Sequence, residues 1–361
     1  MSVATQRRID RVLGRPICAV LSLLGGRHLG RIDQQEPKRI LVILLSEMGS
    51  LVLAAPMFRY LRRRYSAASL FVLTFERNLP VLEMLRPVPL SNVFTVNGES
   101  LIALMLQSLR VLAKLRRTGI DTVLDCELFS RISAILGFLT GAPLRVGFGA
   151  FTQGGLYRGR LINRPVLYNP YQHISGQFLT LARAVDSSGV PPAKRPREAA
   201  SFLPPVMEPK AGELEELETR LRADFSSLAG KRLVLLYPGG GLLPIRAWPL
   251  AYFKRLAREL TAGGYAVGII GMRDDRDLAE AIVHHCEGEA CADLTGYTRT
   301  VRELMALFHL ASLLITNDGG PGHFASMTPL PAILLFGPET PELYGSLSPN
   351  AVHVYASFSC S

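Results

Sequence analysis

Aliphatic strands alternate with amphipathic helices along most of the chain. The first uninterrupted aliphatic run, residues 39–45 (RILVILL), has the length of one strand and is typical of a strand buried on both faces of a parallel sheet. The first half also contains predicted strands at 70–74, 92–96 and 121–125, and predicted helices at 56–65, 101–117 and 131–140. This alternation predicts an α/β class with a doubly wound parallel sheet.

The alternation starts again after a proline-rich stretch at 191–209, which indicates a linker. The second series consists of helices at 213–222, 250–262 and 301–311, and strands at 232–237, 266–270, 313–316 and 332–336. We therefore predict a segment at 1–36, a Rossmann-like domain at 37–205 and a second at 206–361. Strand ends from both domains are expected to face a cleft between them.

Charge divides the chain in a similar way. Residues 1–200 carry 27 basic and 12 acidic side chains, whereas residues 201–361 carry 13 and 18, within a net charge of +10. The basic half favours a polyanion or an anionic membrane surface as its partner. Because this half has no helix-turn-helix, zinc-finger or RNP-like signature, we expect no nucleic-acid partner.

The composition excludes several classes of protein. With 48% hydrophobic and 19% charged residues, the chain is not a disordered or low-complexity scaffold. No apolar run reaches the roughly 18 residues that span a bilayer, which excludes a polytopic membrane protein. The five cysteines are scattered without CxxC spacing, so neither a disulfide framework nor a zinc site is predicted. No Asp-x-Asp sequence follows a strand, and we expect no metal.

The N-terminal segment combines arginines with a short apolar run. Arg7, Arg8, Arg11 and Arg15 precede the apolar residues 17–24. The arrangement resembles a signal peptide, but no A-x-A-type cleavage site follows. A cationic, apolar helix too short to cross a bilayer fits the lipid headgroup region, and a helix packed on its own domain fits equally well. We expect a cytoplasmic protein, peripheral on the inner face of the cell membrane.

Two glycine-rich loops follow strands of the second half. Residues 238–241 (PGGG) follow one strand and residues 317–323 (NDGGPGH) follow another. Glycine lets backbone N–H groups approach a ligand, and a helix N-terminus carries about half a positive charge. The second loop is therefore a candidate pyrophosphate site, with His323 facing the anion. An ordinary glycine-rich turn is the alternative.

As a set, several motifs resemble a known family, the ADP-heptose:lipopolysaccharide heptosyltransferases of glycosyltransferase family 9. The similar segments are 40–56, 125–131, 246–249 (RAWP), 293–296 (DLTG), 317–323 and 336–342 (FGPETPE). The resemblance implies a GT-B fold, in which two Rossmann-like domains face each other across a cleft. It also implies a nucleotide-diphospho-sugar donor such as ADP-heptose and no separate cofactor.

The resemblance places the donor in the C-terminal domain. Arg246 stands where the family often has lysine, and its guanidinium would bind two phosphate oxygens at once. Asp274 matches the region that meets the ribose, with surface charge as its alternative role. The complete predicted donor set is Gly239, Gly240, Arg246, Asp274, Asn317, Asp318, Gly319, Gly320 and His323.

The chain departs from the family at the predicted base. Members usually carry Gly-Asp in the loop after the first strand, whereas Ser50 occupies the aspartate position here. Serine alone is not a base, so the predicted catalytic group comprises Ser50 and two candidate carboxylates, Glu47 and Glu127. A structural acceptor in the loop is the alternative for Glu47, and an ion pair with Arg131 is the alternative for Glu127.

The acceptor is expected to bind the N-terminal domain. Asp125 and Arg131 match the family's segment after the fourth strand, and His173 falls where the family often has a histidine facing the cleft. Ion pairing for the first two and a structural hydrogen bond for His173 are the alternatives. Further basic side chains suit an anionic lipid-linked or glycan acceptor, with solvated surface charge as the alternative; these are Arg145, Arg158, Arg160 and Arg164.

These observations predict an inverting, metal-independent glycosyltransferase. It would move heptose or a related sugar from a nucleotide-diphosphate donor to lipopolysaccharide core or another cell-envelope glycan. Two alternatives stay open. A catalytically degenerate protein could act as a binding or assembly subunit, which the loss of aspartate at Ser50 favours. A nucleotide-sugar epimerase of the same fold would need no acceptor.

Overall fold

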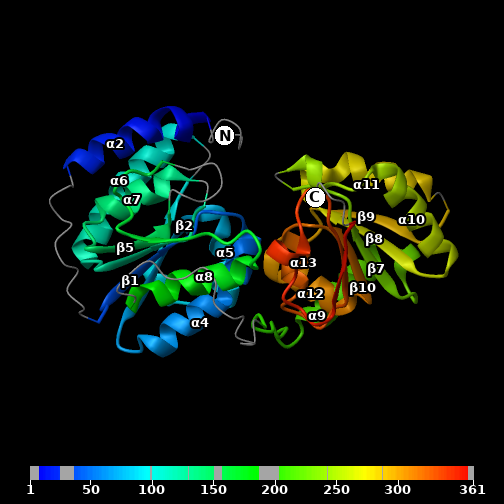
Figure 1. The fold of residues 1–361 in the computed structure, drawn as a ribbon. Coiled ribbons are helices and arrows are strands. Elements are labelled where there is room, and N and C mark those ends of the chain that lie inside the picture. Colours follow the sequence, from blue (N-terminus) through cyan, green and yellow to red (C-terminus); the bar gives the residue numbers. More distant parts are fainter. Residues whose placement is uncertain are drawn as a thin grey trace. The chain divides into compact units, whose positions relative to one another are not determined.

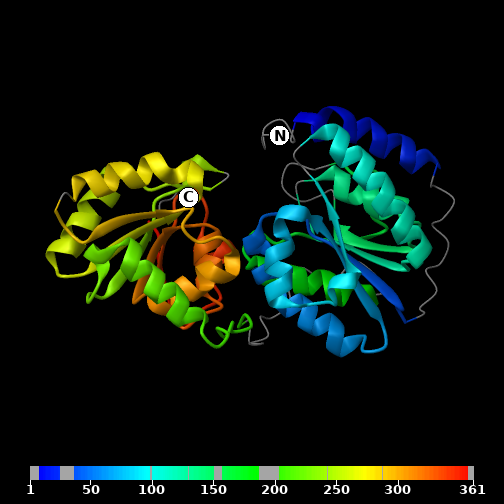
Figure 2. The same cartoon turned by 180° about the vertical axis from the view of Figure 1, so that it is seen from behind.

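The computed structural model describes residues 8–24, 36–97, 100–128, 130–149, 157–186, 203–241, 243–286 and 288–356. The chain divides into two compact units, Met1–Phe202 and Leu203–Ser361. Each unit contains a six-stranded parallel sheet with helices on both faces (Figures 1 and 2). The predicted linker lies mostly outside the described residues.

Unit 1 is a doubly wound sheet with the order β3-β2-β1-β4-β5-β6. Its strands are β1 (Arg39–Ile43), β2 (Ser69–Phe75), β3 (Val93–Val96), β4 (Thr122–Asp125), β5 (Leu144–Phe148) and β6 (Arg164–Val166). Its helices are α2 (Arg15–Leu24), α3 (Met48–Leu53), α4 (Ala55–Arg64), α5 (Leu79–Leu85), α6 (Leu101–Thr118), α7 (Arg131–Leu139) and α8 (Ile174–Arg183). A π-helical turn, η1 (Asp10–Gly14), precedes α2, and short 3-10 turns occur at η2 (Glu76–Asn78), η3 (Leu90–Asn92) and η4 (Ala184–Asp186).

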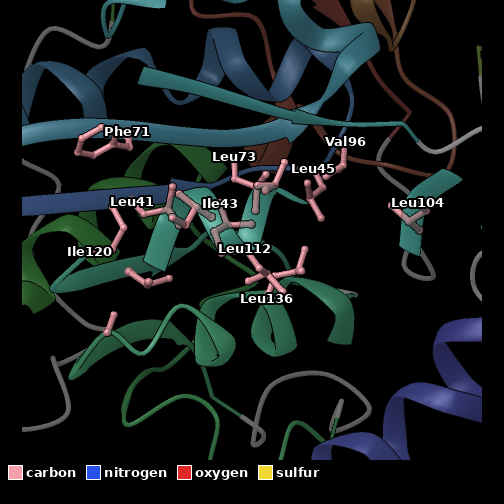
Figure 3. Packing of buried hydrophobic residues seen from close by; sticks show 14 residues of the cluster. Leu41, Ile43, Leu45, Phe71, Leu73, Val96, Leu104, Leu112, Ile120 and Leu136 are labelled. Atoms are coloured by element: carbon pink, nitrogen blue, oxygen red, sulfur yellow. The ribbon is translucent and has the colours of Figure 1, made fainter. Parts of the chain in front are cut away.

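The central strand β1 explains the uninterrupted aliphatic run. Leu41 and Ile43 point into the cluster that β2 shares with α6 and α7 (Figure 3). Ile40 and Val42 are also fully buried, and because successive side chains alternate they point to the opposite face. Burying each such side chain stabilises the fold by about 1.5–3 kcal/mol. Both faces of this strand therefore have to be apolar.

Unit 2 repeats this architecture with the order β12-β11-β10-β7-β8-β9. Its strands are β7 (Leu233–Tyr237), β8 (Ala266–Gly271), β9 (Cys291–Thr295), β10 (Leu313–Asn317), β11 (Ala332–Leu335) and β12 (Ala351–Val354). Its helices are α9 (Glu213–Asp224), α10 (Leu250–Ala262), α11 (Arg276–His285), α12 (Val301–Leu310), α13 (Gly320–Ala325) and α14 (Pro341–Tyr344), with 3-10 turns η5 (Ser226–Leu228), η6 (Pro244–Arg246) and η7 (Arg273–Asp275). Phe253 of α10 is fully buried in its core.

The strand order creates one topological switch point in each unit. In unit 1 the chain turns to opposite sides after β1 and after β4, which are neighbours in the sheet. In unit 2 the corresponding neighbours are β7 and β10. The loops that leave the carboxyl ends of two such strands diverge and leave a crevice, where open α/β sheets bind their ligands. The site is therefore sought at these two points.

The predicted α/β class and all eight predicted strands are confirmed. The apolar N-terminal run forms α2, and one of its faces packs on α7. Among the described residues, no helix is long and apolar enough to cross a membrane. The four cysteines in the described part of the chain are buried thiols, whereas Cys360 lies outside it.

Candidate functional site

Two of the predicted catalytic residues share the loop that leaves β1. Glu47 is the residue before α3, and Ser50 lies in the first turn of that helix, where its N–H donates to the Glu47 carbonyl over 3.0 Å. Both side chains are partly exposed. The loop passes the carboxyl end of β4, at the switch point of unit 1. The structure therefore places this carboxylate and this hydroxyl where a ligand of the sheet is expected.

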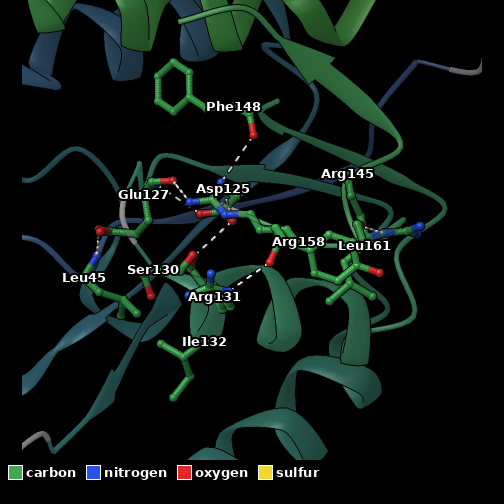
Figure 4. Close-up of polar contacts among 12 residues, drawn as sticks. Leu45, Asp125, Glu127, Ser130, Arg131, Ile132, Arg145, Phe148, Arg158 and Leu161 are labelled. Carbon is green, nitrogen blue, oxygen red and sulfur yellow. Dashed lines mark hydrogen bonds and ion pairs between the residues drawn. The ribbon is translucent and has the colours of Figure 1, made fainter. Parts of the chain in front are cut away.

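Glu127, the second candidate base, lies beneath this loop rather than on it. Its Oε1 accepts a hydrogen bond from the backbone N–H of Leu45 over 2.6 Å (Figure 4). The same oxygen accepts from the Ser46 N–H over 2.8 Å, and the Ser46 hydroxyl donates to both carboxylate oxygens. The residue is only 7% exposed. Burial raises the pKa of Glu127, while the hydrogen bonds from Ser46 and Leu45 lower it. Its oxygens are thus occupied in holding the loop that carries Glu47.

Asp125 and Arg158 form a second buried layer behind Glu127 (Figure 4). Asp125 accepts hydrogen bonds from the Glu127 N–H (3.1 Å) and the Ser133 hydroxyl (3.0 Å). Arg158 Nη1 lies 3.9 Å from Asp125 Oδ2, and its Nη2 donates to the Glu127 carbonyl. Burial raises the pKa of Asp125 to about 6, and the Arg158 charge opposes that rise. Asp125 therefore supports the site from within and presents no surface to an acceptor.

The other two predicted acceptor residues make local structural contacts. Arg131, at the start of α7, donates from its Nη1 to Asp10 over 2.9 Å and from its Nε to the Tyr157 carbonyl. His173 precedes α8, and its Nδ1 accepts from the Ser175 N–H over 3.2 Å. A histidine in this position caps the helix by satisfying a backbone donor of its first turn. The contact of His173 matches its structural alternative. Arg131 does form an ion pair, but with Asp10, and not with Asp125 or Glu127 as the alternative had it.

Three of the four further arginines turn inward. Arg145 and Arg158 are buried, and Arg164 is partly buried. All three donate to backbone carbonyls, for example Arg145 Nε to Leu161 and Arg164 Nη1 to Val185, each over 2.6 Å. Solvated surface charge and an acceptor contact are therefore both wrong for the buried Arg145 and Arg158, because hydrogen bonds to internal carbonyls hold their guanidinium groups. The role of the partly buried Arg164 stays a prediction. Arg160 is exposed.

The switch point of unit 2 is organised by Asn317, at the end of β10. This side chain is fully buried. Its Nδ2 donates to the carbonyls of Pro238 (2.9 Å) and Gly239 (3.0 Å), and its Oδ1 accepts from the Trp248 N–H (3.0 Å). One amide thereby joins the glycine loop after β7 to the start of α10. Glu127 has the same role in unit 1. Each of the two residues lies at the end of the fourth strand of its unit and holds, by hydrogen bonds, the loop that follows the first strand.

The residues predicted at the diphosphate follow Asn317 directly. Asp318 is 4% exposed, and its Oδ2 lies 3.6 Å from the Nε of Arg246 in an ion pair. Gly319 precedes α13, Gly320 begins it, and His323 is buried within it. The structure thus brings Arg246 from one loop to Asp318 on another. The aspartate orients the guanidinium, a group whose N–H donors suit phosphate oxygens.

Two glycines of the loop after β7 pack closely against their neighbours. A Cβ on Gly239 would lie 2.7 Å from Asp275 Oδ1, and one on Gly240 would lie 2.8 Å from the Leu243 carbonyl oxygen. Asp274, the predicted ribose contact, is exposed on η7. Asp275 is the acid that lies beside the glycine loop, and its Oδ2 accepts from the Met272 N–H over 2.9 Å. Burial raises the pKa of Asp275.

Asp275 and an aromatic pair are site features that the sequence pattern did not reveal. Trp248 and Tyr252 stack with ring centroids 4.9 Å apart, and both are exposed beside the Arg246 loop. Trp248 lies before α10 and Tyr252 lies in its first turn, so the i, i+4 rule for residues on one helix face does not apply to this pair. For the adjacent Asp274 and Asp275 the sequence gives no indication either, since the conformation of the η7 turn decides which of them faces the glycine loop.

The arrangement supplies two sets of chemical groups. Unit 1 offers a carboxylate and a hydroxyl at its switch point, and unit 2 offers a guanidinium, glycine backbone and the start of a helix. Such groups serve proton abstraction and the binding of phosphate oxygens, respectively. Within the described ranges, no group of three or more His, Cys, Asp or Glu side chains is placed to hold a metal ion.

The chain is similar to known proteins in both sequence and fold. Residues 108–361 match the family described as glycosyltransferase family 9 (heptosyltransferase). Lipopolysaccharide heptosyltransferase 2 of Salmonella typhimurium is 26% identical over 327 residues, which cover 87% of this chain and 86% of the relative.

Two solved structures share the fold. The structure of E. coli ADP-heptose lps heptosyltransferase II superposes with a TM-score of 0.67 at 23% identity, over 88% of this chain and 90% of that one. An E. coli heptosyltransferase with ADP-2-deoxy-2-fluoro heptose has a TM-score of 0.61 at 18% identity, over 88% and 93%. With its two Rossmann-like units of the GT-B class, the chain therefore belongs to glycosyltransferase family 9 and is a glycosyltransferase.

Proposed function

We propose that this protein transfers heptose from ADP-heptose to an acceptor of the lipopolysaccharide core. The observation that carries the proposal is the assembly around Asn317, which fixes the glycine loop, the Arg246 segment and the start of α13 to one another. The family match, and the ADP-sugars named for the two E. coli structures, support ADP-heptose as the donor. The name of the Salmonella relative supports the acceptor class.

Donor binding is assigned to unit 2. Arg246 would meet the diphosphate while Asp318 holds the guanidinium in place. Backbone N–H groups at Gly319 and Gly320 would add neutral donors at the start of a helix, where the dipole favours anions. The net charge of residues 201–361 is negative, so these local groups have to outweigh the overall field. They would also stabilise the ADP that departs.

We assign the base to Glu47. Its carboxylate would accept the proton of the acceptor hydroxyl as that oxygen forms a bond to the anomeric carbon. The bond from this carbon to the diphosphate oxygen breaks on the opposite face, so ADP leaves and the configuration inverts. Glu127 is a positioning residue, because its oxygens hold the backbone on which Glu47 is mounted. General base catalysis of this kind contributes about 10²–10⁴-fold to the rate.

A direct assay tests the proposal. Full-length protein would be incubated with ADP-heptose and a lipopolysaccharide core acceptor that ends one heptose short. We expect one ADP for each heptosylated acceptor and, by NMR, an inverted anomeric configuration. Retained configuration would contradict the direct displacement.

The replacement of aspartate by Ser50 favours one alternative, a binding or assembly subunit without catalysis. That protein would bind ADP-heptose, raising its melting temperature, yet release no ADP with any envelope acceptor. Conversion of the nucleotide sugar to an isomer without acceptor would instead identify an epimerase. The Arg246→Gln variant is a control for all three outcomes, since it should weaken donor binding in each.

A further inference from the structure

The N-terminal helix is fixed to unit 1 along one side. Asp10 accepts hydrogen bonds from the N–H groups of Arg131 (2.7 Å) and Ile132 (3.2 Å), so it caps α7 from a distant part of the chain. Cys18 is fully buried with Ala134 and Leu161. The Ser22 hydroxyl accepts from the Arg160 N–H over 2.8 Å. The helix is therefore an ordered part of the domain and not a loose tail.

The other side of this helix exposes an apolar stripe. Its members follow one another at intervals of three or four residues, so they share one face of the helix. They are Leu13, Ile17, Val20 and Leu23, which are 42–84% exposed, with Val12 beside them. Aliphatic side chains in contact with water gain no free energy from burial. Contiguous apolar patches of this kind mark surfaces that contact a partner or a membrane.

The charges around the stripe are all positive. Arg8, Arg11 and Arg15 are exposed and recur at intervals of three and four residues. Asp10 is the one acid between residues 8 and 24, and its carboxylate is turned to Arg131 and the start of α7. The outward surface of this helix therefore consists of aliphatic side chains flanked by guanidinium groups.

We propose that this face of η1 and α2, Leu13 to Leu23 with the three arginines, lies on a bilayer with anionic headgroups. Aliphatic side chains would enter the boundary of the acyl chains, and the arginines would meet phosphate groups. Since the helix is already docked on α7, binding would not have to order it. A ten-residue helix is about 15 Å long, which suits the plane of the interface and not a crossing.

The charge pattern decides between a bilayer and a second copy of this chain. Two copies meeting through this face would offer the arginines no acid on the facing helix, because Asp10 is the one acid of this segment and is turned to α7. Anionic lipids supply such counter-charges, and residues 1–200 as a whole carry 15 more basic than acidic side chains. A second helix of unit 1 has a similar composition. On α6 the exposed Met105, Leu106 and Leu109 are followed by the exposed Arg110 and Lys114.

Vesicle sedimentation without sugar substrates tests the proposal independently of transferase activity. Full-length protein would be mixed with vesicles of phosphatidylcholine alone or with a quarter of phosphatidylglycerol. We expect partitioning onto the anionic vesicles that falls as salt is raised. The double variant Val20→Gln and Leu23→Gln should lose about tenfold or more. The double variant Arg8→Gln and Arg11→Gln should lose about fivefold per arginine, on anionic vesicles only.

A matched control keeps the result interpretable. Val352→Gln removes an equally exposed aliphatic side chain on β12 of unit 2 and should partition like wild type. All these side chains are exposed, so melting temperatures should stay the same. The proposal is overturned if wild type ignores anionic vesicles, or if the Val20 and Leu23 variant binds them as wild type does. A shift from dimer to monomer in that variant, without loss of lipid binding, would assign the face to a second copy instead.

Discussion

The two carboxylates at the switch point of unit 1 should differ in how much kcat falls when their charge is removed. Glu47 is partly exposed on the loop, whereas Glu127 is buried and binds the backbone of Leu45 and Ser46. We consider three variants: Glu47→Gln, Glu127→Gln and Glu127→Ala. A base is defined by its ability to take a proton, and a positioning residue by its hydrogen bonds, so glutamine separates the two roles.

The expected magnitudes follow from the contacts. Glutamine at 127 keeps a carbonyl oxygen that accepts from both N–H groups, and its amide can donate to the Ser46 hydroxyl. We therefore expect a stability change within about 2 kcal/mol and a kcat within about tenfold of wild type. Alanine at 127 leaves the buried N–H of Leu45 without its partner, at about 1–3 kcal/mol, and the part-buried N–H of Ser46 at a smaller cost. Glutamine at 47 removes the base and should lower kcat by about 10²–10⁴-fold with unchanged stability.

Two measurements are needed for each variant. Release of ADP from ADP-heptose in the presence of acceptor gives kcat and KM, and urea unfolding gives the free energy of unfolding. For Glu127→Ala we expect reduced stability together with reduced kcat, because the loop that carries Glu47 loses its support. The roles are distinguished if Glu127→Gln keeps the kcat that Glu127→Ala loses, whereas Glu47→Gln does not keep it. The assignment fails if Glu127→Gln loses activity by 10²-fold or more while Glu47→Gln transfers heptose normally.

Three further changes test other parts of the structure. In Asn317→Asp a carboxylate oxygen replaces the Nδ2 that donates to two carbonyls over 2.9 and 3.0 Å. Calorimetry should then show ADP binding weakened about tenfold or more, and the free energy of unfolding should fall by about 2–4 kcal/mol. Burial raises the pKa of Asp125 from 3.8 to about 6, so its ionisation costs about 3 kcal/mol and stability should fall as pH rises through this interval. Urea unfolding at several pH values across the interval should show that the Asp125→Asn variant lacks this fall in the free energy of unfolding. The same pH dependence in variant and wild type would refute the assignment. A Cβ in Gly239→Ala would meet Asp275 Oδ1 at 2.7 Å and should weaken ADP binding, whereas one in Gly337→Ala meets no atom within 3.8 Å and should leave it unchanged.

The sequence by itself determined the fold class. Continuous aliphatic runs such as 39–45 identify central strands, because only strands covered on both faces are apolar at every position. The pattern missed four strands, none of which is a continuous aliphatic run. β5 (LRVGF) and β9 (CADLT) are mostly buried, but arginine and glycine interrupt the first and aspartate interrupts the second. β6 has three residues, one of them proline, and β12 is only partly buried at the sheet edge. Segments so short or interrupted carry too weak a periodic signal to be distinguished from loops.

The sequence also indicated which short segments are candidates for the site, since glycine-rich and charged residues follow the ends of the predicted strands. Only the tertiary structure decided the role of each side chain. Glu47 and Glu127 are the same residue type in the sequence. In the structure Glu47 lies on the loop, whereas Glu127 lies beneath it and accepts four short hydrogen bonds. Asp274 and Asp275 are adjacent, and the turn alone sets which one faces the glycine loop. Sequence spacing reports position along the chain, whereas exposure and hydrogen bonding depend on segments about 80 residues away, such as Glu127 and Leu45.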